Sequence, residues 1–267
     1  MIVVAIHEID RVRDSSSTRS LLGFTGKPDA GNRTSGGGEQ FLRFLEQELV
    51  PYIDKEFSTL PYRIYCGYSF TALNVVDAFL AANSVFDAFL AIDPSWWWDD
   101  YAPERKAGKT LPGRTFSRTQ LFIAATSETY PQKYFIESRD VAALDATLQR
   151  IRPSGLDWKF QRYTDESHHS MALRALYDGL TYFFRGYRPT IDELYLKPEQ
   201  LASRYQALSE RLGEQFALNE GLLLFFGDLF LNEFKEPDRA VRYYEMATEA
   251  YPGSPAARQK LQALRGK

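Results

Sequence analysis

The sequence is poor in the residue types that build disulfides, metal sites and nucleotide sites. It contains one cysteine and three histidines among 267 residues, so Cys66 has no partner for an internal disulfide. Cysteine, histidine and acidic residues are nowhere grouped at metal-ligand spacing, and neither a P-loop nor a dinucleotide-binding fingerprint occurs. We therefore expect no metal and no cofactor.

Positive charge and long apolar runs are scarce as well. The net charge is −3, which gives no basic footprint for nucleic acid. No apolar run approaches the ~20 residues that cross a bilayer. No secretory leader is recognisable at the start. These features predict a cytoplasmic location if Met1 is the native start, and export if a leader is missing from the sequence.

Apolar β-type runs alternate with helical patterns over the first two thirds of the chain. This alternation predicts an α/β fold with a mostly parallel sheet flanked by helices. Cys66 falls in the second predicted strand, where we expect it to be buried. The predicted strands cover residues 2–6, 63–66, 86–92, 120–125 and 158–163, and the predicted helices cover 39–57, 73–82, 138–150 and 173–184.

The pattern changes near residue 190. Residues 198–264 are helical in pattern throughout, and Ala240, Tyr244 and Ala247 have the spacing of a tetratricopeptide second helix. We predict an α/β domain over 1–189 and a small helical, tetratricopeptide-like region over 190–267. Because one such repeat cannot bury its apolar face alone, this region is a candidate surface for self-association or for a protein partner.

A sharp strand-to-helix turn is predicted at Gly67-Tyr68-Ser69. A strand precedes the turn and an apolar helix follows it. This is the context of a nucleophile elbow, in which the turn lifts a serine hydroxyl above the edge of the sheet. We expect Ser69 to be a nucleophile, and we expect the backbone N–H of the next residue, Phe70, to stabilise the oxyanion.

A serine nucleophile needs a base and an acid that orients the base. His168 and His169 lie in the loop after the last predicted strand, where a hydrolase histidine belongs, whereas His7 is expected to be structural or to line the pocket. Glu128 is the leading candidate for the acid because it follows the penultimate strand. Asp93, directly after the strand before that, is the alternative.

Aromatic residues follow the same predicted sheet edge. Trp96 and Trp97 come just after Asp93, and Tyr68 precedes the serine. These side chains could wall an apolar pocket for the acyl group, or the tryptophans could pack a loop onto the sheet. We keep both interpretations at this point and take Tyr68, Trp96 and Trp97 as candidate pocket residues.

Several segments resemble, in order, the esterase family of α/β-hydrolases that includes the enterochelin (siderophore) esterases and the IroE-like serine esterases. The segments are CGYSFTAL, FDAFLAIDPSWWWD, YTDESHHS and YDGLTYFF, and the resemblance covers residues 1–187. It implies a serine hydrolase of small-molecule carboxylic esters, with Ser69 as nucleophile and His168 as the family's histidine. The helical tail resembles the tetratricopeptide-type extension of some of these esterases.

The sequence departs from the family pattern at the elbow and at its start. The family usually reads G-H-S-x-G-G, whereas Tyr68, Thr71 and Ala72 stand here. Family members also carry further N-terminal strands, so we expect the sheet to be short on that side. These departures leave a second interpretation open, in which a catalytically weakened hydrolase fold acts as an interaction module through its helical tail.

Overall fold

The computed structural model describes residues 1–7, 9–128, 131 and 140–265, and the chain divides into two compact units, Met1–Phe183 and Phe184–Lys267. The division falls six residues before the boundary predicted at residue 190. The first unit contains the sheet, and the second is built from helices. Each unit is described by itself.

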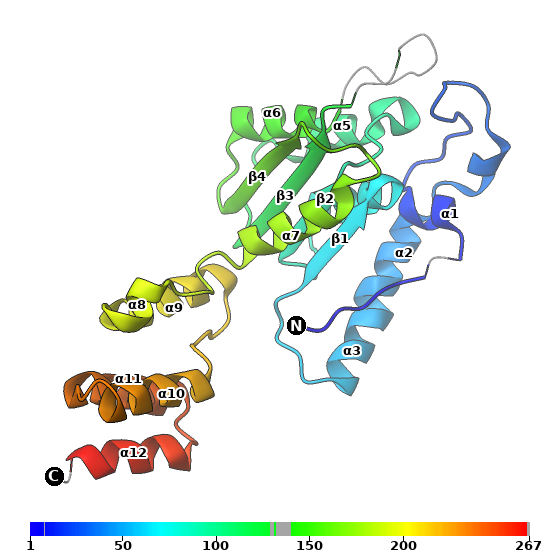
Figure 1. Cartoon of the computed structure of the whole chain (residues 1–267). Coiled ribbons are helices and arrows are strands. Elements are labelled where there is room, and N and C mark those ends of the chain that lie inside the picture. Colours follow the sequence, from blue (N-terminus) through cyan, green and yellow to red (C-terminus); the bar gives the residue numbers. More distant parts are fainter. Residues whose placement is uncertain (8, 129–130, 132–139, 266–267) are drawn as a thin grey trace. The chain divides into compact units, whose positions relative to one another are not determined.

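A four-stranded parallel sheet forms the centre of the first unit (Figure 1). Its strands β1 (Ile64–Tyr68), β2 (Ala88–Ile92), β3 (Thr119–Thr126) and β4 (Leu156–Tyr163) lie side by side in chain order. All four carboxyl ends therefore meet at one edge, where ligands of open α/β sheets bind. The predicted fold class, a parallel sheet flanked by helices, is confirmed.

Helices cover both faces of this sheet. The central strands β2 and β3 are buried along their length because their side chains are apolar on both sides. Helix α4 packs on β1 and β2, and α7 packs on β2 and β3. The helices and helical turns of the unit are α1 (Arg11–Ser15), η1 (Ala30–Thr34), α2 (Gly38–Phe44), η2 (Leu45–Leu49), α3 (Val50–Glu56), η3 (Ser69–Thr71), α4 (Ala72–Leu80), α5 (Trp98–Thr110), α6 (Ala142–Ile151) and α7 (Met171–Phe183).

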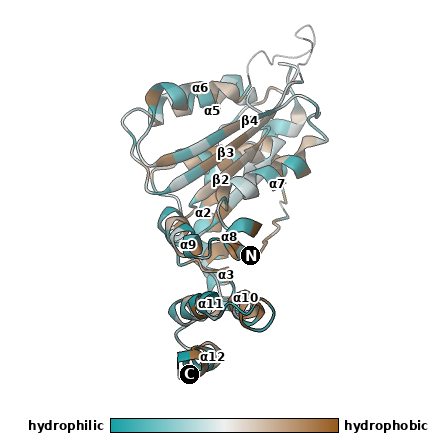
Figure 2. Ribbon diagram, turned by 60° about the vertical axis from the view of Figure 1, so that its left-hand side comes forward, coloured by the Kyte–Doolittle hydropathy of each residue, from teal (hydrophilic) through white to brown (hydrophobic). Residues whose placement is uncertain are grey.

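Helices α7 and α4 pack closely against the two faces of the sheet. A Cβ added to Gly179 of α7 would lie 2.6 Å from Leu90 Cδ1, so this glycine lets α7 approach β2 without displacing the Leu90 side chain. On the other face, Phe79 of α4 packs edge-on against Phe89 of β2 and stacks on Phe116. Figure 2 shows the apolar residues of the strands between these helical layers.

The strand predicted over residues 2–6 is wrong. The segment has no regular secondary structure, and Val3 is 77% exposed. Its β-branched residues suit a sheet, but they meet no neighbouring strand there. As a result β1 forms one edge of the sheet, and Cys66 on that strand is exposed rather than buried.

Helix α5 was not predicted. Its first turn contains three residues with left-handed backbone angles, Asp99, Asp100 and Tyr101, and Pro103 follows inside the helix. The segment is mostly charged or polar and contains this proline, so it lacks the regular apolar spacing that marks a helix in sequence. The element nevertheless packs on α4 and α6 and buries Ala102 and Ala107.

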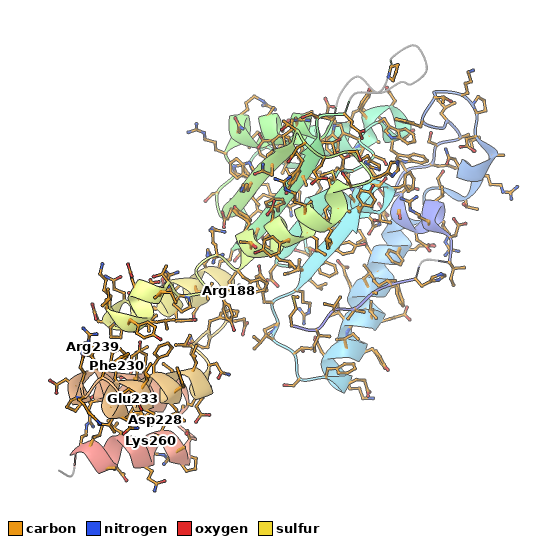
Figure 3. All side chains as sticks on the ribbon, in the orientation of Figure 1. Arg188, Asp228, Phe230, Glu233, Arg239 and Lys260 are labelled. Atoms are coloured by element: carbon orange, nitrogen blue, oxygen red, sulfur yellow. The ribbon has the colours of Figure 1, made fainter. Side chains whose placement is uncertain are left out.

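The second unit consists of five helices along its described residues. A Cβ on Gly227 would lie 2.3 Å from the Tyr244 ring, which shows how closely α10 and α11 approach. Figure 3 labels Lys260, which pairs with Asp228 at 2.6 Å. The tetratricopeptide-like assignment stays a prediction. The helices are α8 (Ile191–Tyr195), α9 (Glu199–Leu212), α10 (Glu220–Asn232), α11 (Pro237–Ala250) and α12 (Pro255–Arg265).

Within the second unit, aromatic residues make up much of the core. Tyr243 of α11 stacks on Phe226 and Phe230 of α10, with ring centroids 5.4 and 5.7 Å apart. Arg239 places its guanidinium 5.4 Å from the Phe230 ring centroid, and both are labelled in Figure 3. Among the residues that the structure describes, no helix is long and apolar enough to cross a bilayer.

Candidate active site

Ser69 lies on a strained turn at the carboxyl end of β1. Its φ of 59° is in the left-handed region, which a residue with a side chain rarely adopts. The turn also needs Gly67, because a Cβ there would lie 2.7 Å from the Thr71 carbonyl oxygen and 2.8 Å from Val75 Cγ2. The sharp turn predicted from Gly67-Tyr68-Ser69 is therefore present, and it leads directly into η3 and α4.

Thr71, which replaces a glycine of the family pattern, closes this turn. Its hydroxyl accepts a hydrogen bond from the Tyr68 backbone N–H at 2.9 Å and donates one to the Tyr68 carbonyl at 2.8 Å. The threonine therefore satisfies both polar backbone groups of the residue before Ser69. The neighbouring Ala72 is fully buried at the start of α4.

Ser69, His168 and Asp93 form a continuous hydrogen-bonded row. Nε2 of His168 lies 3.0 Å from Oγ of Ser69, and Nδ1 of the same ring lies 2.7 Å from Oδ2 of Asp93. The side chains of His168 and Asp93 are 21% and 17% exposed. The row is therefore shielded from bulk water but open enough for a substrate to reach it. Its geometry matches a serine, base and acid arrangement.

The sequence favoured Glu128 as the orienting acid, and the structure corrects this assignment. Glu128 Oε2 accepts a hydrogen bond from the backbone N–H of His168 at 2.6 Å, while the ring nitrogen Nδ1 faces Asp93. Both acids follow strands that end at the same sheet edge. Glu128 lies two residues beyond the end of β3, which brings its carboxylate to the loop backbone rather than to the imidazole.

Asp93 is held in place by the end of the neighbouring strand. It has a left-handed φ of 43°, and its backbone N–H donates to the Ala124 carbonyl at 2.8 Å. Its carboxylate accepts from the Thr126 backbone N–H at 3.3 Å and from the Thr126 hydroxyl at 3.4 Å. These contacts aim the carboxylate at His168.

The loop that carries His168 is tied to the start of α7. Arg174 pairs with Asp165 at 2.8 Å and with Glu166 at 3.3 Å. The hydrogen bond from Arg174 is the main reason that the pKa of Asp165 lies below its usual value. The Ser170 hydroxyl donates to Glu166 at 2.5 Å. The loop is thus braced on both sides of the histidine.

The other two histidines lie apart from the row. His169 is exposed, with its ring edge-on to the His168 ring at 5.3 Å. His7 is exposed in the N-terminal segment. Neither has a hydrogen bond to Ser69 among those that the structure records. No three His, Cys, Asp or Glu side chains within the described ranges gather closely enough to hold a metal ion.

Phe70 follows the serine and begins the helical segment. Its backbone N–H lies in the first turn of η3, where N–H groups have no partner within the helix and point toward the helix N-terminus. Its side chain is 8% exposed and packs edge-on against Trp98 at 4.9 Å. The Arg11 guanidinium lies 5.6 Å from the same phenylalanine ring, so one cation stands near the elbow.

The three residues predicted to line the pocket have different positions. Trp96 is fully buried, and its indole N–H donates to Glu104 at 3.3 Å, so the expectation that it lines a pocket is wrong. Trp97 is half-buried and lies 5.1 Å from the Phe24 ring. Tyr68 contacts His168 through its hydroxyl and its ring. Sequence reasoning missed Thr126, which binds the Asp93 carboxylate, because a threonine at a strand end belongs to no motif.

A comparison with curated proteins finds a sequence relative of this chain. A siderophore enterobactin esterase from Emericella nidulans is 26% identical, and the aligned region covers 58% of each chain. The chain thus spans little more than half the length of this relative. No protein-family model matches the sequence.

Solved structures align over more of the chain. An IroE-like serine hydrolase from Shewanella oneidensis aligns with 91% of this chain and 77% of its own, with a TM-score of 0.75 and 24% identity. A siderophore hydrolase from Aspergillus nidulans aligns with 68% of each chain, with a TM-score of 0.53 and 22% identity. The resemblance inferred from the sequence motifs is confirmed, and the chain has the fold of the IroE-like serine hydrolases.

Proposed function

We propose that this protein is a serine hydrolase that cleaves carboxylic esters through an acyl-enzyme intermediate. The observation that carries the proposal is the row from Ser69 Oγ through His168 to Asp93, with contacts of 3.0 and 2.7 Å. A serine alcohol is a weak nucleophile unless an adjacent base removes its proton during attack. An imidazole suits this task because its ordinary pKa lies close to neutral pH.

The first half of the reaction forms the acyl-enzyme. Ser69 Oγ attacks the ester carbonyl carbon while His168 Nε2 takes the hydroxyl proton, and the carbonyl oxygen becomes an oxyanion. Asp93 fixes the ring tautomer and stabilises the imidazolium that forms. The imidazolium then gives its proton to the leaving alkoxide as the carbon–oxygen bond breaks. An alcohol departs, and the acyl group remains on Ser69.

The second half returns the free enzyme. His168 takes a proton from a water molecule, whose oxygen attacks the acyl carbon. Collapse of the second oxyanion breaks the bond to Ser69 Oγ, which recovers the proton from the imidazolium, and the carboxylic acid leaves. The Phe70 N–H would stabilise both oxyanions. Such a donor changes kcat by about 10²–10³ in a serine protease.

Siderophore esters are the first natural substrate class to assay. The curated relative is named as an enterobactin esterase. Arg11, close to Phe70, gives the elbow one cation for an acidic ester. The rival role, an interaction module without chemistry, is not favoured, because it does not require an intact row of Ser69, His168 and Asp93.

The test compares the wild type with Ser69→Ala. Wild-type protein should hydrolyse p-nitrophenyl butyrate with burst kinetics and should react with a fluorophosphonate probe at one site. The alanine variant should show no labelling and a kcat about 10⁴–10⁶ lower. A wild-type protein that neither labels nor turns over the ester, or an alanine variant that is as active as the wild type, would refute the proposal.

A further inference from the structure

We propose that Tyr68 is a positioning residue that holds the base against the nucleophile. The inference rests on the proposed function and deepens it. Tyr68 stands where the related esterases usually have histidine, and the sequence suggested only that it lines the pocket. Its contacts instead lead to the backbone and the ring of His168.

Tyr68 contacts His168 in two ways. Its hydroxyl donates a hydrogen bond to the His168 carbonyl oxygen at 2.5 Å. Its ring stacks on the imidazole, with centroids 4.9 Å apart and planes inclined by 30°. One side chain therefore fixes the backbone of the base and also covers one face of its ring.

The two backbone polar groups of His168 are bound by side chains from different strand ends. Tyr68, at the end of β1, holds the carbonyl, and Glu128, beyond the end of β3, holds the N–H at 2.6 Å. With the peptide fixed, the imidazole can rotate only about its two side-chain bonds. The bond from Nδ1 to Asp93 sets that rotation.

Tyr68 directly precedes Ser69 in the sequence. Any displacement of the elbow therefore moves the nucleophile together with the side chain that holds the base. Thr71 fixes the Tyr68 backbone from the other side through its hydroxyl. This path connects the helix start, the nucleophile and the base. It preserves the 3.0 Å contact between Ser69 Oγ and His168 Nε2.

A positioning role and a pocket role predict different kinetics. A residue that only touches bound substrate changes KM when it is removed, because substrate and transition state lose the same contact. A residue that aligns the base changes kcat, because proton transfer depends on geometry in the transition state. The stacked ring also faces the charge that develops on the imidazole, and aromatic faces attract cations.

The experiment compares Tyr68→Phe and Tyr68→Leu with the wild type on p-nitrophenyl butyrate. Tyr68→Phe loses the hydrogen bond and keeps the ring, so kcat should fall about three- to tenfold while KM changes less than about twofold. Tyr68→Leu also loses the stack and should cost about a further two- to tenfold. The rate of fluorophosphonate labelling should fall by the same factors, since labelling requires the activated serine but no substrate pocket.

Tyr62→Phe is the matched control. Tyr62 also donates a short hydrogen bond, 2.6 Å to Gln120, but it precedes β1, at the opposite end of the strands from Ser69. Its kcat and its labelling rate should equal those of the wild type. Circular dichroism spectra of all variants should match that of the wild type.

Each other result has a clear meaning. An unchanged kcat with a raised KM in Tyr68→Phe would overturn the positioning role and restore the pocket role. So would a Tyr68→Leu variant with wild-type labelling rates. These failures are distinct from failure of the proposed function, in which the wild type itself would neither label nor hydrolyse the ester.

Discussion

The carboxylate of Asp93 lies 2.7 Å from Nδ1 of His168, on the far side of the ring from Ser69. A ring that donates its Nδ1–H to this carboxylate presents Nε2 as the acceptor of the serine proton in the proposed reaction. Glu128 contacts only the backbone of the same residue. The two acids therefore have different expected roles, which mutation can separate.

Asp93→Asn should lower kcat by about 10²–10⁴, because an amide can stabilise the wrong tautomer of His168 and does not balance the imidazolium. Glu128→Gln should lower kcat less than about tenfold, because its amide oxygen can still accept from the backbone N–H. The measurement is kcat on p-nitrophenyl butyrate for both variants at one pH. Equal losses, or a larger loss for Glu128→Gln, would assign the orienting role to Glu128 instead.

Gly67→Ala should destabilise the first unit by about 1–3 kcal/mol and abolish labelling of Ser69, because the new methyl group overlaps the Thr71 carbonyl. Thermal unfolding followed by circular dichroism measures the loss. Gly108→Ala is the matched control, since a Cβ there has no atom within 4 Å. Alanine should be neutral or stabilising by about 1 kcal/mol in that helix. A Gly67→Ala protein with wild-type stability would contradict the tight elbow described above.

Alkaline pH should destabilise the helical unit. Burial raises the pKa of Tyr205 to about 12 and also raises the pKa values of Tyr243 and Tyr244. These phenols are harder to ionise in the folded chain than in the unfolded chain. Below the unfolded pKa of about 10 they are neutral in both states, so they make no pH-dependent change in the free energy of unfolding. Stability should then fall as the pH rises from there toward the folded pKa values.

The measurement for this prediction is urea unfolding at pH 8, 10 and 11, with tyrosinate absorbance near 295 nm as a second probe. Exposed tyrosines such as Tyr52 and Tyr177 should ionise near pH 10 in the folded chain, and the remaining rise in phenolate absorbance should accompany unfolding. Triple replacement of Tyr205, Tyr243 and Tyr244 by phenylalanine should leave the absorbance below the unfolding transition unchanged, and a loss of absorbance there would contradict the assigned burial.

The sequence predicted the central features of the site because they depend on local patterns. A strand, a glycine and a helix around Ser69 require only neighbouring residues, and His168 follows the last strand in chain order. The choice between Asp93 and Glu128 was wrong because both follow strands of the same sheet edge. Their contacts in the structure distinguish the two acids. Thr126 binds the Asp93 carboxylate, whereas the Glu128 carboxylate binds the loop backbone.

The fold was predictable where burial and periodicity agree. The strands β2 and β3 are apolar on both sides and were found from that pattern. Residues 2–6 have the same composition, yet they have no strand beside them, and composition does not show which neighbour a strand will have. Helix α5 was missed because its sequence is mostly charged or polar and contains Pro103, so no apolar spacing marks it.

The positive φ of Ser69 carries a cost that the fold must offset. A side chain in that backbone region is disfavoured, whereas glycine adopts it freely. A chain with glycine at position 69 should therefore melt at a higher temperature than the natural one, even though it would have lost its hydroxyl. The requirements of conformational stability and of reactivity conflict at this single residue. The serine supplies the hydroxyl and lowers the stability of the fold.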